Sequence, residues 1–168
     1  MDVFDAARTV LAVRAFQDKP IPREVIEEIV ESARLTGSSV NGQPWLFIVI
    51  QDRNTLNRLG KLAKTGPYIS QAPMAVAVVI EKTKYSESDA SRAIQSMMLT
   101  AWSHGVGSNW VGFYNLDQVK PILAIPDHLQ ILAIIPFGYP QKNIGKGKKQ
   151  RKPISEVVYL ERFGQPFK

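Results

Sequence analysis

Residues 38–50 read Ser-Ser-Val-Asn-Gly-Gln-Pro-Trp-Leu-Phe-Ile-Val-Ile, a polar loop that runs directly into an apolar segment. The loop consists of residue types that favour turns. The apolar segment, residues 45–50, has the length of a strand and no alternation with polar residues, which predicts a strand buried on both faces. Helical spacing of apolar residues precedes the loop, so the stretch predicts a connection from a helix into a buried sheet.

Outward from this stretch, helical and strand patterns alternate along the chain. Apolar residues at three- and four-residue steps predict helices up to about Val13, from Pro22 to about Thr36, around Leu56 to Leu62, from Ser86 to His104 and around residues 117–123. Further apolar runs predict strands at residues 74–80, 106–113 and 129–137. Four strands interleaved with helices, without a domain-sized break in composition, predict a single layered α/β or α+β domain over residues 1–168.

The segment from Ser86 to His104 has the clearest helical pattern. Ser86 is placed to cap its N-terminus and Gly105 to end it. Its apolar stripe is rich in Met and Trp. Such a stripe most often faces a core, although it also suits an interface between proteins, and both interpretations stay open.

Composition narrows the possible chemistry. The 168 residues include no cysteine and two histidines, and 21 Lys and Arg against 15 Asp and Glu give a formal charge of +6. The lack of cysteine excludes disulfides, thiolate-bound zinc, iron–sulfur clusters and a cysteine nucleophile. His104 and His128 do not have the spacing of a zinc site, so no metal site is predicted. Catalysis must therefore use other groups or a bound cofactor.

Familiar catalytic and nucleotide-binding motifs do not match. A hydrolase triad could be assembled only from Ser38, Asp127 and His128, without the Gly-x-Ser-x-Gly turn that would expose the serine. The glycines at 105 and 107 follow a helix rather than open one, so they are not a dinucleotide-binding fingerprint. Neither a serine hydrolase nor a Rossmann enzyme is predicted.

Charge and hydropathy bear on location and partners. No apolar run reaches the roughly 18 residues of a membrane span, and the acidic start of the chain does not resemble a secretory signal. We therefore expect a cytoplasmic protein without a membrane partner. The basic segment 142–152 would suit an anionic ligand; because it contains glycines and no interleaved aromatics, nucleic acid is the weaker alternative.

Three local groups of residues could bind an anionic, ring-containing cofactor. Lys149 and Arg151 are two residues apart, so in an extended segment both can reach one phosphate. The loop 38–41 presents hydroxyls and an amide, and Gly112 ends an apolar strand where backbone can approach a ligand closely. Each group taken alone is also typical of an ordinary loop or strand end.

Taken in order, several motifs resemble those of the nitroreductase family. They are Arg14-Ala15-Phe16, Pro20-Ile21-Pro22, residues 38–41, Gln43-Pro44-Trp45, Ala72-Pro73, Phe137-Gly138-Tyr139-Pro140 and Arg151-Lys152-Pro153. The resemblance spans nearly the whole chain. It implies an α+β nitroreductase fold with a central mixed or antiparallel sheet flanked by helices. It also implies a homodimer that holds FMN in two interface clefts, with the C-terminal segment extending onto the partner subunit.

The resemblance also implies roles for particular residues. Arg14 would lie near the flavin ring or ribityl chain, and Lys149 and Arg151 would hold its phosphate. The loop 38–41 would come from the partner chain. Its residues Ser38, Ser39 and Asn41 would reach the flavin, and Gln43 would support the loop. The backbone at Val111 and Gly112 would approach flavin N5, and the residues expected to line the substrate pocket are Tyr68, Trp110 and Phe113. Because the reaction occurs at N5, no catalytic acid or base is required.

One stretch departs from the family pattern. Val10-Leu11-Ala12 stands where the family usually has a phosphate-binding arginine and a serine, and Gly37 replaces a proline before the serine loop. Each hydrogen bond to a charged group is worth about 1.5–3 kcal/mol, so the absence of one or two would weaken FMN binding. Arg8, one helical turn earlier, is the candidate replacement.

The resemblance implies an FMN-dependent oxidoreductase. It would pass a hydride from NADH or NADPH through flavin N5 to a nitroaromatic, quinone or similar conjugated acceptor by a ping-pong mechanism. The departure at residues 10–12 leaves an alternative, a nitroreductase-like flavin-binding protein with little or no turnover.

Overall fold

The sheet of this protein is antiparallel and has the strand order β1-β2-β4-β3. The computed structural model describes residues 1–112, 116–142, 144 and 149–167. Its strands are β1 (Trp45–Ile50), β2 (Met74–Ile80), β3 (Gly107–Ser108) and β4 (Gln130–Gly138). The α+β prediction is confirmed, and the strands near 45–50, 74–80 and 129–137 form where the apolar runs predicted them.

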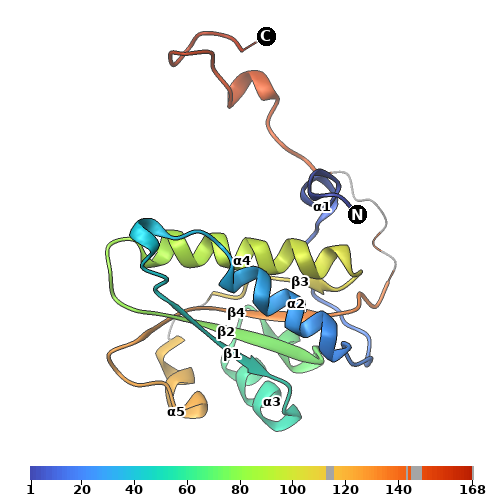
Figure 1. The fold of residues 1–168 in the computed structure, drawn as a ribbon. Helices are drawn as coiled ribbons and strands as arrows, with labels where there is room; N and C mark the ends of the chain where they lie inside the picture. The colour runs from blue at the N-terminus through green and yellow to red at the C-terminus, as the bar shows by residue number, and fades with distance from the viewer. Residues whose placement is uncertain (113–115, 143, 145–148, 168) are drawn as a thin grey trace.

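Helices cover both faces of the sheet (Figure 1). The helices are α1 (Val3–Thr9), α2 (Arg23–Arg34), α3 (Arg53–Leu62), α4 (Ser86–Ser103) and α5 (Lys120–Leu123). Short 3-10 turns occur at Ser39–Asn41, Pro67–Gln71, Leu116–Val119 and Ile154–Glu156. Helices α2 and α4 pack together on one face, and α3 covers the other.

The central strand β2 shows why the fold is layered. Met74, Val76 and Val78 pack toward α2 and α4, whereas Ala75 and Ala77 pack toward α3. Alternate side chains of a strand point to opposite faces, so this continuous apolar run serves two cores. Every residue of β2 is buried, as predicted.

Strand β1 is less buried than its sequence predicts. It pairs only with β2 among the described strands and so lies at the edge of the sheet. Leu46 is 46% exposed and Val49 is 38% exposed. The prediction of burial on both faces was therefore wrong for β1, because a run of apolar residues does not reveal that only one side of the strand pairs with another described strand.

The N-terminal helix is shorter than predicted, because residues after Thr9 extend along the sheet. Ala12 forms a bridge with Ser108, and Phe16 forms one with Pro140. Val13 is buried, and a side chain at Gly107 would come within 2.2 Å of it. We call residues 10–17 the strap, since they tie α1 to the sheet beside β3.

Two further predictions need correction. The expected strand at 106–113 is reduced to Gly107–Ser108, followed by an isolated bridge between Val111 and Ile134; Phe113 lies outside the described residues. Ser86 is the first residue of α4 and not its cap, because its hydroxyl is bonded to Thr83 in the preceding turn. The Met-containing stripe of α4 faces the core, with Met97 fully buried.

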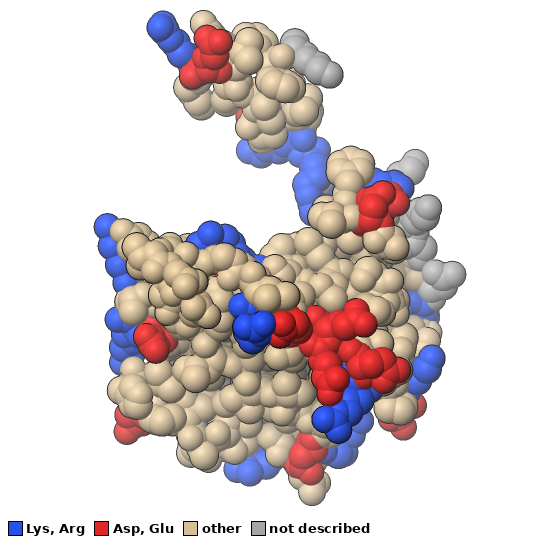
Figure 2. Space-filling view, in the orientation of Figure 1, with Lys and Arg blue, Asp and Glu red and all other residues tan. Residues whose placement is uncertain are grey.

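The C-terminal segment, residues 149–167, leaves the body of the molecule (Figure 1). Figure 2 shows it standing apart, with basic side chains where it joins the body. Several large apolar side chains on it are exposed: Ile154, Val157, Leu160, Phe163 and Phe167. Within the described residues, no helix combines the length and apolar character needed to cross a bilayer.

Candidate functional site

The loop between α2 and β1 adopts a conformation that side chains disfavour. Val40, Asn41 and Gln43 all have positive φ, at 50°, 55° and 48°. Asparagine tolerates this region, but a β-branched residue such as valine rarely adopts it. Strain of this kind costs about 1–3 kcal/mol at each such residue and persists only where the surroundings impose it. We call residues 38–43 the serine loop.

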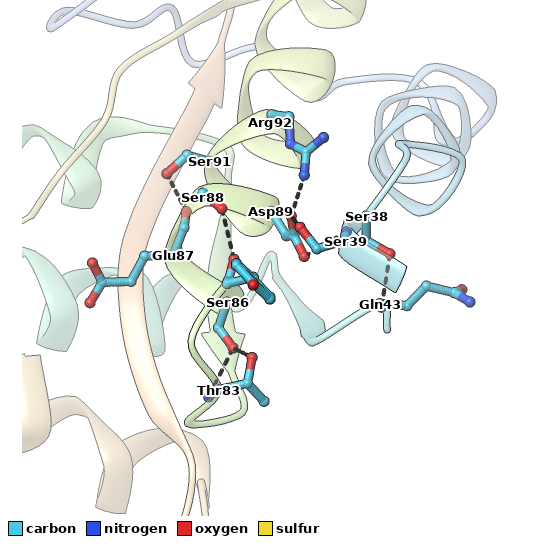
Figure 3. Close-up of polar contacts among 11 residues, drawn as sticks. Ser38, Ser39, Gln43, Thr83, Ser86, Glu87, Ser88, Asp89, Ser91 and Arg92 are labelled. Atoms are coloured by element: carbon cyan, nitrogen blue, oxygen red, sulfur yellow. Dashed lines mark hydrogen bonds and ion pairs between the residues drawn. The ribbon is translucent and has the colours of Figure 1, made fainter. Parts of the chain in front are cut away.

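Helix α4 holds the serine loop through a buried carboxylate (Figure 3). Asp89 accepts hydrogen bonds from the backbone N–H of Ser39 at 3.0 Å and from its hydroxyl at 2.9 Å. The Asp89 side chain is 1% exposed and is also paired with Arg92. Burial acts to raise the pKa of Asp89, but the hydrogen bonds from Ser39 and the Arg92 guanidinium outweigh it, so the pKa lies below its ordinary value.

Other bonds close the serine loop on itself and on α4. The backbone N–H of Gln43 donates to the Ser38 hydroxyl oxygen at 2.9 Å, and its side-chain amide reaches Asn41 at 3.3 Å. Just before the loop, the Thr36 hydroxyl donates to Ser96 of α4 at 2.8 Å. These hydrogen bonds therefore fix the conformation of the loop, and Val40 at its tip is 94% exposed. Gln43 closes the loop through its contacts with Ser38 and Asn41.

The two predicted phosphate ligands, Lys149 and Arg151, lie toward the C-terminal end of α4, whereas the serine loop lies at its N-terminal end. The Lys149 ammonium donates to the backbone oxygen of Ala7 at 2.5 Å, in the last turn of α1. Burial lowers the pKa of Lys149, and the charge of Arg151 lowers it further. The two cations are thus close enough to repel, and neither has an acidic partner among the described residues. We call Lys149 and Arg151 the cation pair.

The strap places Arg14 on the surface beside β3. Val13 and Phe16 are buried and Arg14 is exposed between them. The strap is held at both ends, by a hydrogen bond from Val13 to Ser108 at 2.9 Å and from Gln17 to Tyr139 at 2.8 Å. Arg14 therefore extends from a fixed backbone.

Arg8, the candidate replacement for the missing family arginine, is already engaged. It forms an ion pair with Asp5 at 2.6 Å. Both residues line a cavity of about 400 Å³ between α1, Trp102 near the end of α4, and Pro140. None of the predicted cofactor residues is among the described residues that line this cavity.

The backbone at Val111 is paired with the sheet, whereas the next residue, Gly112, lies at the surface. The N–H of Val111 donates to the Ile134 oxygen at 3.0 Å, so it is not free to bind a ligand. Gly112 is exposed, and a side chain there would come within 3.2 Å of the Trp110 ring nitrogen. Among the predicted pocket residues, Trp110 is 39% exposed, whereas the Tyr68 hydroxyl is bonded to Asn109 at 2.6 Å.

Two groups of the predicted residues, the serine loop and the cation pair, lie toward opposite ends of α4. The serine loop is bonded to Asp89 in its first turn, whereas the strap and α1 contact its last turn, where the Trp102 ring nitrogen donates to Thr9 at 2.9 Å. An α4 of 18 residues is about 27 Å long. A single chain therefore does not bring the predicted cofactor residues into one site.

Sequence reasoning missed Asp89 as a member of this arrangement. The available signal was its position four residues before Ala93, on the buried stripe of α4. A carboxylate on that stripe needs a buried hydrogen-bonding partner. The sequence did not indicate which segment supplies that partner, because Ser39 is 50 residues away.

Solved structures share this architecture. The putative NADH dehydrogenase/NAD(P)H nitroreductase from Parabacteroides distasonis superposes with a TM-score of 0.86 at 24% identity, covering 96% of this chain and 98% of that one. An FMN-dependent nitroreductase from Clostridium difficile gives 0.84 at 23% identity, covering 95% and 99%. The fold is therefore the nitroreductase fold.

Sequence comparison identifies the family to which the chain belongs. The family described as "Putative TM nitroreductase" matches residues 2–167. A Methanothermobacter thermautotrophicus protein named "Putative NADH dehydrogenase/NAD(P)H nitroreductase" is 32% identical over 154 residues, covering 86% of this chain and 81% of that protein. A Bacillus subtilis FMN reductase [NAD(P)H] is 24% identical, covering 90% and 70%. The chain belongs to the nitroreductase family and is a nitroreductase-type oxidoreductase.

Proposed function

We propose that two copies of this chain form a homodimer that binds FMN at two clefts and uses NADH or NADPH to reduce a nitroaromatic, quinone or similar conjugated acceptor. One observation carries the proposal. The cation pair and the serine loop lie at opposite ends of α4, about 27 Å in length, so they can share one cofactor only if each comes from a different chain.

The relatives support the same class of chemistry. The Bacillus subtilis relative is named FMN reductase [NAD(P)H], and the Clostridium difficile structure is an FMN-dependent nitroreductase. The chain contains no cysteine, and the part of the proposed site that the structure describes holds no paired acid and base, which suits a reaction that a bound flavin performs.

The described residues fit a flavin phosphate. Lys149 is half-buried, and this burial together with the neighbouring Arg151 charge lowers its pKa. A phosphate placed between the two cations would relieve their repulsion and accept charge-assisted hydrogen bonds from both. Arg14, exposed on the fixed strap, is a third cation for the ring or ribityl chain. These three would compensate for the arginine and serine that Val10-Leu11-Ala12 does not supply, since Arg8 is bonded to Asp5.

The remaining residues would orient the ring. Bound FMN would supply the redox chemistry by taking a hydride at N5 from a reduced nicotinamide and passing it to the acceptor. Toward N5, the N–H of Gly112 would be the backbone donor, because that of Val111 is bonded to Ile134. From the partner chain, the Ser38 hydroxyl and the Asn41 amide would reach the flavin. Trp110, 39% exposed, would line the acceptor side.

The exposed apolar surfaces suit a dimer. The C-terminal segment carries exposed apolar side chains, and β1, with its exposed Leu46 and Val49, lies at the edge of the sheet that the described strands form. An edge strand and an exposed apolar segment each favour association with another chain. We propose that the C-terminal segment of each chain extends onto the partner subunit.

The test begins with the purified full chain. Size-exclusion chromatography with light scattering should give twice the chain mass, and FMN titration should reach one flavin per chain. Riboflavin, which lacks the phosphate, is the matched control and should bind more weakly. Anaerobic addition of NADH or NADPH should then bleach the flavin absorbance. A monomer, or a protein that takes up no FMN, would overturn the proposal.

The second candidate is a flavin-binding protein with little turnover, and Val10-Leu11-Ala12 is the observation that favours it. Steady NADH or NADPH consumption with a quinone or nitroaromatic acceptor separates the two. Sustained turnover supports the reductase, whereas a single bleaching step without recycling supports the binding protein.

A further inference from the structure

Asp89 is a buried carboxylate that none of the predicted chemistry uses. It lies in the first turn of α4, and its side chain is 1% exposed. Two of its hydrogen bonds come from one residue of the serine loop, the N–H and the hydroxyl of Ser39. A buried carboxylate with two donors from a distant loop acts as a fixed attachment point for that loop.

The serine loop needs such an attachment. Val40, a β-branched residue, has a φ of 50° and is 94% exposed, so packing of its own side chain does not impose the conformation. The constraint comes from both sides of Val40: Ser39 is fixed on Asp89, and Gln43 closes the loop by donating its N–H to Ser38. Thr36, bonded to Ser96, adds a second attachment two turns along α4.

The hydrogen bonds also divide the loop's polar groups by role (Figure 3). The Ser39 hydroxyl donates to Asp89, so its proton is committed inside the chain. The Ser38 hydroxyl accepts from Gln43 and keeps its own proton to donate elsewhere. Ser38 and Asn41 can therefore present donors outward, whereas Ser39 cannot do so without releasing Asp89.

We propose that Asp89 is a positioning residue for cofactor binding: it holds the strained serine loop so that Ser38 and Asn41 face the partner chain's flavin, and Ser39 acts through Asp89 rather than on the flavin. The inference rests on the proposed function, because it assumes that the loop meets FMN across the dimer. Arg92 stabilises the ionised carboxylate from the exposed side of α4.

A double-mutant cycle on the full-length dimer tests this division of roles, with the dissociation constant of FMN as the readout. Asp89→Ala removes both acceptors and should raise the Kd about tenfold or more. Ser39→Ala should raise it less, since the N–H of residue 39 still reaches Asp89. Once Asp89 is Ala, adding Ser39→Ala should change the Kd by less than about twofold. Asp89→Asn keeps one acceptor and should restore part of the affinity.

Asp52 provides the matched control. Its carboxylate also accepts from a backbone N–H and a hydroxyl, both of Thr55 at 2.8 Å, but it caps α3 on the other face of the sheet. Asp52→Ala should lower the unfolding midpoint and leave the Kd for FMN unchanged. This comparison separates loss of loop positioning from loss of general stability.

Amide hydrogen exchange on the cofactor-free protein gives a second readout that does not depend on FMN. In Asp89→Asn, peptides covering the serine loop should exchange faster while peptides from β2 stay protected. Unchanged loop exchange, or an Asp89→Ala protein with wild-type affinity for FMN, would overturn the inference. Full additivity of Ser39→Ala and Asp89→Ala would also overturn it, because Ser39 would then act on the flavin directly. Wild-type protein that takes up no FMN would overturn the proposed function, and loop exchange would still decide whether Asp89 is the anchor.

Discussion

At one end of α4, the serine loop is held by a carboxylate that accepts two hydrogen bonds from it. At the other end, Lys149 and Arg151 lie close together without an acidic partner among the described residues. The first arrangement satisfies its polar groups within the chain, although it keeps Val40 in a strained conformation. The second leaves like charges in proximity, which favours an anion. The two halves of the proposed site are thus organised differently: one is built to hold its shape, and the other to attract a ligand.

Removing the cation pair should have the largest effect on binding. Each charge-assisted hydrogen bond to phosphate is worth about 1.5–3 kcal/mol, so Lys149→Ala with Arg151→Ala should raise the Kd for FMN by about 100-fold or more. Fluorescence titration measures the change. Lys152→Ala, which removes an adjacent exposed cation, is the matched control and should shift the Kd less than about threefold. Equal effects of the control and the double variant would mean that only net charge matters here.

The stability of the strap that carries Arg14 should depend on the packing of Val13 against Gly107 rather than on charge. A side chain at Gly107 would lie 2.2 Å from a methyl carbon of Val13, so Gly107→Ala should overpack the junction and lower stability by about 1–3 kcal/mol. Thermal or denaturant unfolding measures this loss. Adding Val13→Ala creates space and should restore part of it. A Gly107→Ala protein as stable as wild type would show that the strap moves freely from the sheet, contrary to its two hydrogen bonds.

The cation pair should also give FMN binding an alkaline pH dependence. Burial and Arg151 lower the pKa of Lys149, so its folded pKa lies below its unfolded value of 10.5. In the cofactor-free protein, Lys149 therefore favours folding more as the pH rises from the folded pKa toward 10.5. Binding of the FMN phosphate depends on pH in the opposite direction, because the phosphate binds the protonated form of Lys149, which is lost as the pH rises.

The affinity for FMN should accordingly fall as the pH rises past the folded pKa of Lys149, by up to about tenfold per pH unit. Titrations between about pH 7 and pH 10 would measure the fall. Lys149→Arg supplies the control, because arginine stays protonated over this range and should flatten the profile. The same slope in both proteins would assign the titration to another group.

Regular elements were predictable where one local pattern sufficed. Strand β2 was found because each of its residues is apolar and each is buried, and α4 because Ala90, Ala93 and Met97 recur at helical spacing. The strap was missed because Val10 and Leu11 continue the spacing of α1, and only Gly107, nearly a hundred residues later, gives Val13 a better place on the sheet.

The two halves of the site differ in the same way. Lys149 and Arg151 could be proposed as a pair because two residues of extended chain bring them together. The anchoring of the serine loop could not, because it depends on a contact between Ser39 and Asp89 that no local spacing encodes. For the same reason β1 was expected to be buried: whether a strand lies at a sheet edge is a property of the topology.

The smallest expected effect tests whether the serine loop is strained. Val40 has a φ of 50° and is 94% exposed, so Val40→Gly loses little packing and removes the steric conflict. The gain should be about 1 kcal/mol, which raises the unfolding midpoint by about 2–4 °C for a chain of this size. Asn41→Gly is the matched control at a φ of 55°; because asparagine tolerates this region, its gain should be smaller. If Val40→Gly lowered the midpoint instead, the loop would not be storing strain, and the contrast between a constrained end and an anion-attracting end of α4 would lose its first half.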